Sequence, residues 1–190
     1  VVLLALAAVS PAGAASVGVT TRTFTKTSVT TSEPRPLVTV IWYPAVARSG
    51  TPEAFGLRDA TVRRGHYPLI VFSHGTCGRS TQSTYFTMAL AAAGFVVAAP
   101  AHLGNTADEF PDCLSPGAFV DSAANRVPDV RFVLDALLAL ADDSSSFLAG
   151  RLRTDRIGVA GLSFRGFTTL STLQQQPRPV VGLAMVPGRW

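Results

Sequence analysis

Three short, continuous apolar runs are the feature that most constrains how this chain can fold. They occupy residues 68–73, 95–99 and 156–161, and apolar residues at a helical spacing follow each of them. Continuous apolar runs of this length are typical of strands that are buried on both faces of a parallel sheet. Their alternation with helices predicts an α/β fold with a mainly parallel sheet and helices on both faces.

Further elements are expected around these runs. Residues 17–25 and 37–43 predict two strands that pair as a hairpin or meander, and residues 179–185 predict a fourth strand of the parallel type. The intervening residues 46–67 are rich in Arg, Gly and Thr, which indicates an exposed excursion. Helices are expected over residues 80–93, 121–140 and 163–174. Pro128 should then lie near the first turn of the second helix, where proline is tolerated.

Length and composition fit one globular domain. The chain has 190 residues, of which 47% are hydrophobic and 15% charged, and this excludes disordered, collagen-like and coiled-coil proteins. The net charge is +4, but the basic residues are spread along the chain and only Arg63 and Arg64 are adjacent. Without a basic patch, no nucleic-acid partner is expected.

The N-terminus is typical of the end of a secretory signal peptide. Residues 1–9 are apolar but too few to span a bilayer, which takes about 20 residues, and Ala12-Gly13-Ala14 fits the A-x-A cleavage pattern. No Met and no positively charged segment precede the run. We therefore expect residues 1–14 to be a partial signal peptide and the protein to be secreted, without a transmembrane segment. A buried N-terminal strand or helix is the alternative.

The two cysteines, Cys77 and Cys113, agree with an exported protein if they pair. In the chain-entropy view, a bridge between them would stabilise the fold by about 3–4 kcal/mol. The alternative is two separate buried thiols. The sequence leaves both possibilities open.

The clearest chemical motif is the hexapeptide Gly-Leu-Ser-Phe-Arg-Gly at residues 161–166, between an apolar strand and a helix. A nucleophile elbow needs a tight turn with small residues two positions to either side of the serine, whose Oγ it presents above the sheet. Gly161 meets this requirement for Ser163, but Arg165 occupies the second small position. Overpacking typically costs about 1–3 kcal/mol, so we expect Arg165 to impair activity. The alternative is that Ser163 only caps the following helix.

A second motif, Ser73-His74-Gly75-Thr76, directly follows the first buried strand. Acyl transfer creates an oxyanion, which needs backbone N–H donors that are in place before the reaction begins. In this architecture one donor is the residue after the nucleophile, here Phe164, and the other lies in the loop after the earlier strand, where Thr76 is the best position. An ordinary glycine turn is the alternative. His74 is expected to order the loop rather than to act as the base.

Residues 36–186 resemble the N-terminal part of secreted α/β-hydrolases of the platelet-activating-factor acetylhydrolase and dienelactone-hydrolase-like group. The matching segments are residues 41–45, 68–75, 94–97, 126–135 and 157–166. The resemblance implies that Ser163 is the nucleophile and that Thr76 and Phe164 are the oxyanion donors. It also implies hydrolysis of carboxylic esters, lipid-like or small, without a metal or organic cofactor. Bacterial polyester hydrolases and cutinase-like lipases share much of the pattern, so the substrate does not follow.

The chain departs from that group after the nucleophile. Members of the fold carry an acid and then a histidine after the serine, whereas residues 164–190 contain no Asp, Glu or His. All three histidines precede Ser163, and a serine hydroxyl is a weak nucleophile without an adjacent base. We therefore expect residues 15–190 to be the N-terminal portion of a single α/β-hydrolase domain that lacks its C-terminal strands.

Other polar residues support weaker hypotheses. His102 follows the second buried strand and is expected to line the pocket, the less favoured alternative being a base or ligand. The acidic residues at 108–112 match no calcium-loop pattern, so we expect a solvated loop and no metal. Asp129 and Asp135 lie near Arg126 and Arg131 on the second helix, where surface ion pairs of small energetic weight are expected rather than catalytic acids.

Three functions remain open on the sequence alone. The first is a secreted serine esterase acting on a small-molecule ester or lipid. The second is a catalytically inactive hydrolase-like fragment, for which the absent acid and histidine argue. The third is a secreted binding module that uses the cleft without chemistry. A downstream segment with an Asp and then a His would favour the first.

Overall fold

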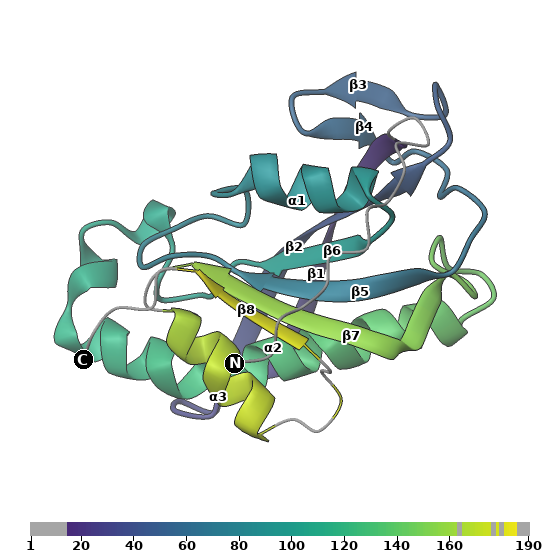
Figure 1. The fold of residues 1–190 in the computed structure, drawn as a ribbon. Helices are drawn as coiled ribbons and strands as arrows, with labels where there is room; N and C mark the ends of the chain where they lie inside the picture. Colours follow the sequence, from purple (N-terminus) through teal and green to yellow (C-terminus); the bar gives the residue numbers. More distant parts are fainter. Residues whose placement is uncertain (1–14, 163–164, 176–177, 179–180, 186–190) are drawn as a thin grey trace.

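The protein is described by a computed structural model, in which the described residues form one eight-stranded sheet with helices on both faces (Figure 1). These residues are 15–162, 165–175, 178 and 181–185. The strand order is β3-β4-β1-β2-β6-β5-β7-β8. In Figure 1, α1 lies on one face of the sheet, and α2 and α3 lie on the other. The predicted α/β class is confirmed, and the expected signal peptide at residues 1–14 lies outside the described residues.

The four strands in the second half of the order, β5 (Tyr67–Ser73), β6 (Val96–Pro100), β7 (Leu152–Leu162) and β8 (Val181–Met185), run parallel to one another. β5, β6 and β7 correspond to the three apolar runs, and β8 lies within the fourth strand that was predicted at residues 179–185. β5 and β6 are buried along most of their length because helices cover them on both sides. β8 lies at the edge of the sheet, and Val181 is 50% exposed there.

The N-terminal strands form the antiparallel part of the sheet. β1 (Ser16–Thr27) and β2 (Pro34–Ala45) pair along their whole length. This antiparallel pair is the hairpin that was one of the two arrangements expected for these strands. β2 also pairs antiparallel with β6 and so joins the hairpin to the parallel strands. The exposed excursion expected at residues 46–67 contains the short strands β3 (Thr51–Glu53) and β4 (Gly56–Arg58), which extend the sheet beyond β1.

The long helix α2 (Pro116–Asp142) begins earlier than expected from the sequence. Its N-cap is Ser115, whose Oγ accepts the N–H of Ala118 at 3.2 Å, and proline occupies the first helical position. Pro128 consequently lies inside the helix, so its expected place near the first turn is wrong. The early start lets α2 extend past the carboxyl end of the sheet.

The other helices are shorter. α1 (Thr84–Ala92) starts after its expected beginning at residue 80, because residues 79–82 form a turn in which Gln82 N–H donates to Arg79 O at 2.9 Å. α3 (Arg165–Gln175) follows β7 and packs against β7, β8 and α2. The strand-to-helix change from β7 to α3 occurs at the residues where the elbow was predicted.

Two apolar cores lie on the two faces of the sheet. Alternate residues of β2 point to opposite faces, so that Ile41 and Tyr43 belong to the core under α2 while Trp42 belongs to the core under α1. From α2, the first core receives Val130, Val133, Leu134 and Leu137. Fully burying a side chain of this size contributes roughly 1.5–3 kcal/mol, so these helices are held to the sheet mainly by apolar contacts.

Candidate active site

The two predicted catalytic motifs begin side by side at the carboxyl edge of the sheet. β5 and β7 are parallel neighbours, and Ser73 at the end of β5 is the register partner of Gly161 near the end of β7. The loop after β5 and the chain after β7 therefore leave the sheet at the same edge. Ser163 and Phe164 lie outside the described residues.

In the turn at residues 75–78, here called the oxyanion loop, three of the four backbone N–H groups donate hydrogen bonds to described residues. Gly75 N–H donates to Gln82 Oε1 at 2.6 Å, Cys77 N–H to Asn105 Oδ1 at 3.3 Å, and Gly78 N–H to Gly75 O at 3.0 Å. Among the residues that the structure describes, the N–H of Thr76 has no acceptor, and Thr76 is exposed. An exposed N–H between fixed neighbours is what an oxyanion donor requires.

Two glycines allow the oxyanion loop to close tightly. A β-carbon at Gly75 would lie 2.9 Å from Gln82 Oε1, and one at Gly78 would lie 2.4 Å from the same oxygen and 2.7 Å from Gly75 O. Neither position therefore accepts a side chain unless the turn or Gln82 moves. The two glycines thus allow the backbone to lie close to the side-chain amide of Gln82, which itself holds the loop.

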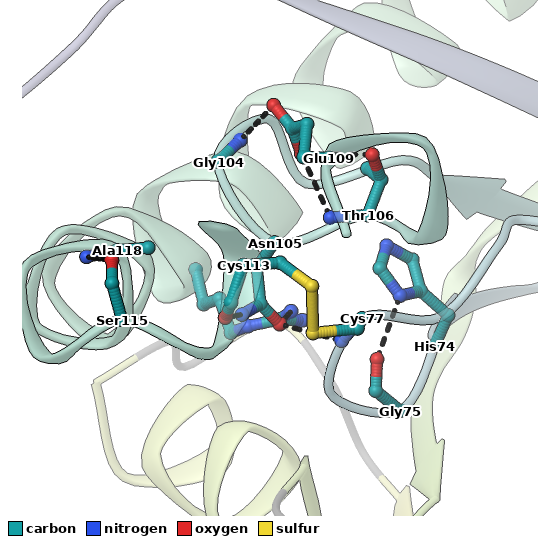
Figure 2. Close-up of a disulfide and its surroundings, with 11 residues drawn as sticks. His74, Gly75, Cys77, Gly104, Asn105, Thr106, Glu109, Cys113, Ser115 and Ala118 are labelled. Atoms are coloured by element: carbon teal, nitrogen blue, oxygen red, sulfur yellow. Dashed lines mark hydrogen bonds between the residues drawn. A yellow bond between two sulfur atoms is a disulfide. The ribbon is translucent and has the colours of Figure 1, made fainter. Parts of the chain in front are cut away.

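A disulfide between Cys77 and Cys113 ties the oxyanion loop to the segment before α2, as Figure 2 shows. Cys77 has a φ of 47°, which is uncommon for a residue other than glycine. Asn105 lies beside the bridge and contacts both half-cystines, since its Nδ2 donates to Cys113 O at 2.9 Å while its Oδ1 accepts from Cys77. The covalent and polar links together fix this unusual backbone conformation.

A buried polar network lies beneath the oxyanion loop. Ser73 Oγ is 3.0 Å from His102 Nε2, and His102 Nδ1 is 2.9 Å from Asp129 Oδ2. The order of these contacts is that of a Ser-His-Asp triad. However, Ser73 is 2% exposed and His102 and Asp129 are 0% exposed, so no substrate reaches the hydroxyl. The network instead joins the end of β5 to the segment after β6 and to α2.

Arg126 connects this network to the oxyanion loop. Its guanidinium donates to Ser73 Oγ at 3.0 Å and to Asn105 Oδ1 at 3.1 Å, while its Nε donates to Ser122 Oγ at 2.9 Å. Burial lowers the pKa of Arg126 to about 9, which still leaves it charged at neutral pH. One arginine of α2 thus positions both the end of β5 and the residue that holds Cys77.

Asp129 provides the negative charge of the network. Its carboxylate accepts from Arg35 Nε at 2.9 Å and lies 3.4 Å from Lys26 Nζ, in addition to its contact with His102. Burial raises the pKa of Asp129, and the charges of Arg35 and Lys26 oppose that shift. The expectation that Asp129 and Arg126 form surface ion pairs is therefore wrong, because both side chains are buried.

Asp135, the other aspartate for which a surface ion pair was expected, does lie at the surface. It pairs with Arg178 rather than with an arginine of its own helix, and its side chain is 50% exposed.

The histidines are engaged in structural contacts. His74 Nε2 accepts the backbone N–H of His102 at 3.0 Å, so its proton is on Nδ1, which donates to Gly75 O at 3.0 Å. His74 thus orders the oxyanion loop, as expected. Both ring nitrogens of His102 are bonded to Ser73 and Asp129, which places this residue under the loop rather than in a pocket. His66 is exposed and directly precedes β5, so it lies at the amino end of this strand, whereas the oxyanion loop follows its carboxyl end.

The acidic segment at residues 108–112 has local structural roles. Glu109 accepts the N–H groups of Gly104 and Thr106, each at 2.8 Å, and so closes this loop (Figure 2). Asp108 pairs at the surface with Arg79. Among the described residues, no group of three metal-ligating side chains comes together.

A hollow of about 370 Å³ adjoins the oxyanion loop. Its floor is the exposed face of β2, with Val38 45% exposed, and its walls include Arg79 and Leu103, the latter 40% exposed. Thr106 also lines it and is bridged to Gly78 of the oxyanion loop. The hollow thus offers a partly apolar surface beside the chain that follows the oxyanion loop, although none of residues 75–78 lines it.

Three residues of this arrangement were not predicted from the sequence: Gln82, Asn105 and Arg126. For Gln82 and Asn105, nothing in the sequence marks the contact, because both reach the loop across a chain reversal. For Arg126 a signal exists, since positions 122, 126 and 129 continue the apolar face of α2 that holds Val130 and Val133. Polar residues on a buried helical face predict a buried network.

Comparisons with known proteins agree with this fold. A family model for platelet-activating factor acetylhydrolase, isoform II, matches residues 45–111, which include the oxyanion loop. A solved ferulic acid esterase from Streptomyces cinnamoneus matches with a TM-score of 0.68 and 24% sequence identity, over 90% of this chain and 58% of its own. This chain thus spans little more than half the length of that esterase.

No curated protein matches the chain. In the described residues, no helix is both long and apolar enough to cross a membrane. The family match and the structural match both agree with the resemblance inferred from the sequence motifs. The chain therefore has the α/β-hydrolase fold and resembles the platelet-activating factor acetylhydrolase and dienelactone-hydrolase-like group.

Proposed function

We propose that the protein is a serine-dependent carboxylic ester hydrolase that acts on a small or lipid-like ester through an acyl-enzyme. The observation that carries the proposal is the Thr76 N–H, which has no acceptor among the described residues and is held between fixed amides at the sheet edge where the chain after Gly161 also emerges. In this proposal Ser163 is the nucleophile, and the N–H groups of Thr76 and Phe164 bind the developing oxyanion. The name of the esterase neighbour agrees with this class of reaction.

The proposed chemistry begins with attack of Ser163 Oγ on the ester carbonyl carbon. The hydroxyl proton must pass to a base, the carbonyl oxygen becomes the oxyanion, and collapse of the tetrahedral intermediate releases the alcohol. Water then releases the acid in the second half of the cycle. The chain's own contribution is a preformed donor at Thr76, which needs no rearrangement when the charge develops.

A catalytically inactive, ligand-binding protein is the second candidate, and the histidines favour it. His74 and His102 use both ring nitrogens inside the buried network. The ring nitrogens of His74 and His102 are therefore already engaged, and His66 precedes β5, at the end of that strand away from the oxyanion loop. Ester binding without turnover would identify this function.

We further propose that the protein is exported. The Cys77–Cys113 disulfide supports this, because disulfides persist mainly in extracytoplasmic compartments. The apolar run and A-x-A pattern at residues 1–14 agree with it.

Labelling with a fluorophosphonate probe tests the proposed nucleophile. The proposal requires a base other than the three histidines; with that base in place the purified protein should be labelled, and Ser163→Ala should lose the label completely because the probe reacts only with an activated serine. Ser145→Ala is the matched control, since Ser145 is exposed in the turn after α2 and belongs to neither motif. A folded chain that takes no label, or a label retained in Ser163→Ala, would contradict the proposed esterase.

Replacing Arg165 by glycine should increase the rate of labelling. Glycine restores the small residue that an elbow requires at this position, and relief of overpacking worth about 1–3 kcal/mol corresponds to roughly a 5- to 150-fold gain. The measurement is the second-order labelling rate constant of the two proteins under identical conditions. Equal rate constants would show that Arg165 does not disturb the elbow.

A further inference from the structure

Two side-chain amides hold the peptide units on either side of Thr76. The Oε1 atom of Gln82 accepts the N–H of Gly75, and the Oδ1 atom of Asn105 accepts the N–H of Cys77. We propose that Gln82 and Asn105 are positioning residues that fix the Thr76 N–H as an oxyanion donor. This inference rests on the proposed esterase function.

Gln82 approaches the oxyanion loop from the start of α1. Its amide oxygen is 2.6 Å from Gly75 N, and the space that side chains at Gly75 and Gly78 would occupy is taken by that same amide. Its own backbone is held by Arg79 O at 2.9 Å, so the side chain starts from a fixed turn. Gln82 is exposed, which means that no apolar core depends on it.

Asn105 approaches the loop from the opposite side and is only 2% exposed. Its Oδ1 also accepts from Arg126, its Nδ2 donates to Cys113 O, and its backbone N–H donates to His102 O at 3.0 Å. The side chain is thus fixed by α2, by the disulfide-bonded segment and by the chain after β6. This explains why the contact to Cys77 can act as a rigid support.

The geometry matters because oxyanion stabilisation depends on donors that are already in place. Thr76 is the exposed residue of the oxyanion loop, and the N–H group of each of its two neighbours is held by one side-chain amide. A displacement of about 1 Å at a reacting group costs up to roughly 100-fold in rate. Loss of either amide should therefore reduce the rate without removing any group that touches the ester.

The experiment compares four variants with the unmodified chain: Gln82→Ala, Gln82→Glu, Asn105→Ala and Asn105→Asp. Glu and Asp keep the acceptor oxygen, whereas Ala removes it. We expect the maximal fluorophosphonate labelling rate to fall roughly 10- to 100-fold in the alanine variants, with the half-saturating probe concentration unchanged. Gln82→Glu and Asn105→Asp should recover most of that loss. Gln174→Ala, an exposed substitution near the end of α3, is the control and should label normally.

Hydrogen exchange at the backbone amides of Gly75 and Cys77, which Gln82 and Asn105 hold, provides a second readout that does not require reactivity. Exchange should accelerate in Gln82→Ala and Asn105→Ala and stay slow in the acidic variants and in Gln174→Ala. Unchanged exchange or unchanged labelling in Gln82→Ala, which keeps its fold because the side chain is exposed, would overturn the inference. If the unmodified chain takes no label, the esterase proposal fails, and exchange alone decides whether the two amides hold the loop.

Discussion

Replacing Asp129 by alanine should lower the free energy of unfolding by about 3–5 kcal/mol. The substitution removes the buried carboxylate that pairs with Arg35, and it takes a partner from Lys26 and His102 as well. The carboxylate of Asp121, 3.4 Å from Arg35, remains, but it is partly exposed and compensates less. A buried charge whose main partner is removed keeps its desolvation cost. Urea unfolding of the unmodified chain and of Asp129→Ala, fitted with the same dependence of the free energy on urea concentration, measures the difference in the free energy of unfolding.

Asp135→Ala is the matched control, because it changes the same residue type on the same helix. Asp135 pairs with Arg178 at the surface, where an ion pair contributes at most about 1 kcal/mol. Both substitutions alter the intrinsic helix propensity of α2 equally, so their difference reports burial and the network. Equal losses in the two variants would show that the buried network does not stabilise the fold as described.

The general architecture could be predicted from the sequence because apolar runs determine it. The runs in β5, β6 and β7 are long enough to be buried on both faces, and only a parallel sheet covered by helices accommodates them. Residues 37–43 likewise predicted the strand β2, but its place between the two cores did not follow from the sequence. These inferences need only local sequence and the tendency of apolar side chains to leave water.

Element boundaries were harder to predict because several short-range signals compete. At the start of α2, the Ser115-Pro116 pair is a standard helix start, yet the two prolines within residues 101–120 suggested a loop up to residue 120. The helix nevertheless begins at Pro116, and polar residues farther along it find partners across the fold. Arg126 bonds to Ser73 beneath the oxyanion loop, and Asn125 accepts from Lys26 of β1. Tertiary contacts of this kind override local preference, and a single sequence does not display them.

The candidate site was predictable in its backbone but not in its supports. The motifs at Thr76 and Ser163 follow from strand-turn-helix patterns, which are local. The supports of the loop make contacts that cross from one element to another, and residue types such as those of Gln82 and Asn105 are common on protein surfaces. His102 illustrates the difficulty, because its place after β6 suggests a pocket residue, whereas its ring is buried between Ser73 and Asp129.

Removing the disulfide, as Cys77→Ala together with Cys113→Ala, should lower the free energy of unfolding by about 3–4 kcal/mol. The bridge joins residues 36 positions apart, and its loss restores to the unfolded chain the conformational freedom that the closed loop removes. Asn105 contacts the backbone of both residues, so the native loop retains its polar links in the double variant. The loss should therefore arise mainly from the unfolded state.

A reducing agent provides the matching test on the unmodified chain. Urea unfolding under a reductant should shift the midpoint of the unmodified chain to that of the double variant, and the double variant itself should not respond. Labelling at Ser163 should persist in the reduced, folded protein, because Gln82 and Asn105 still hold the amides beside Thr76. A midpoint that is the same with and without reductant would mean that the bridge does not restrict the unfolded chain. Labelling that disappears on reduction would instead make the bridge the main support of the oxyanion loop.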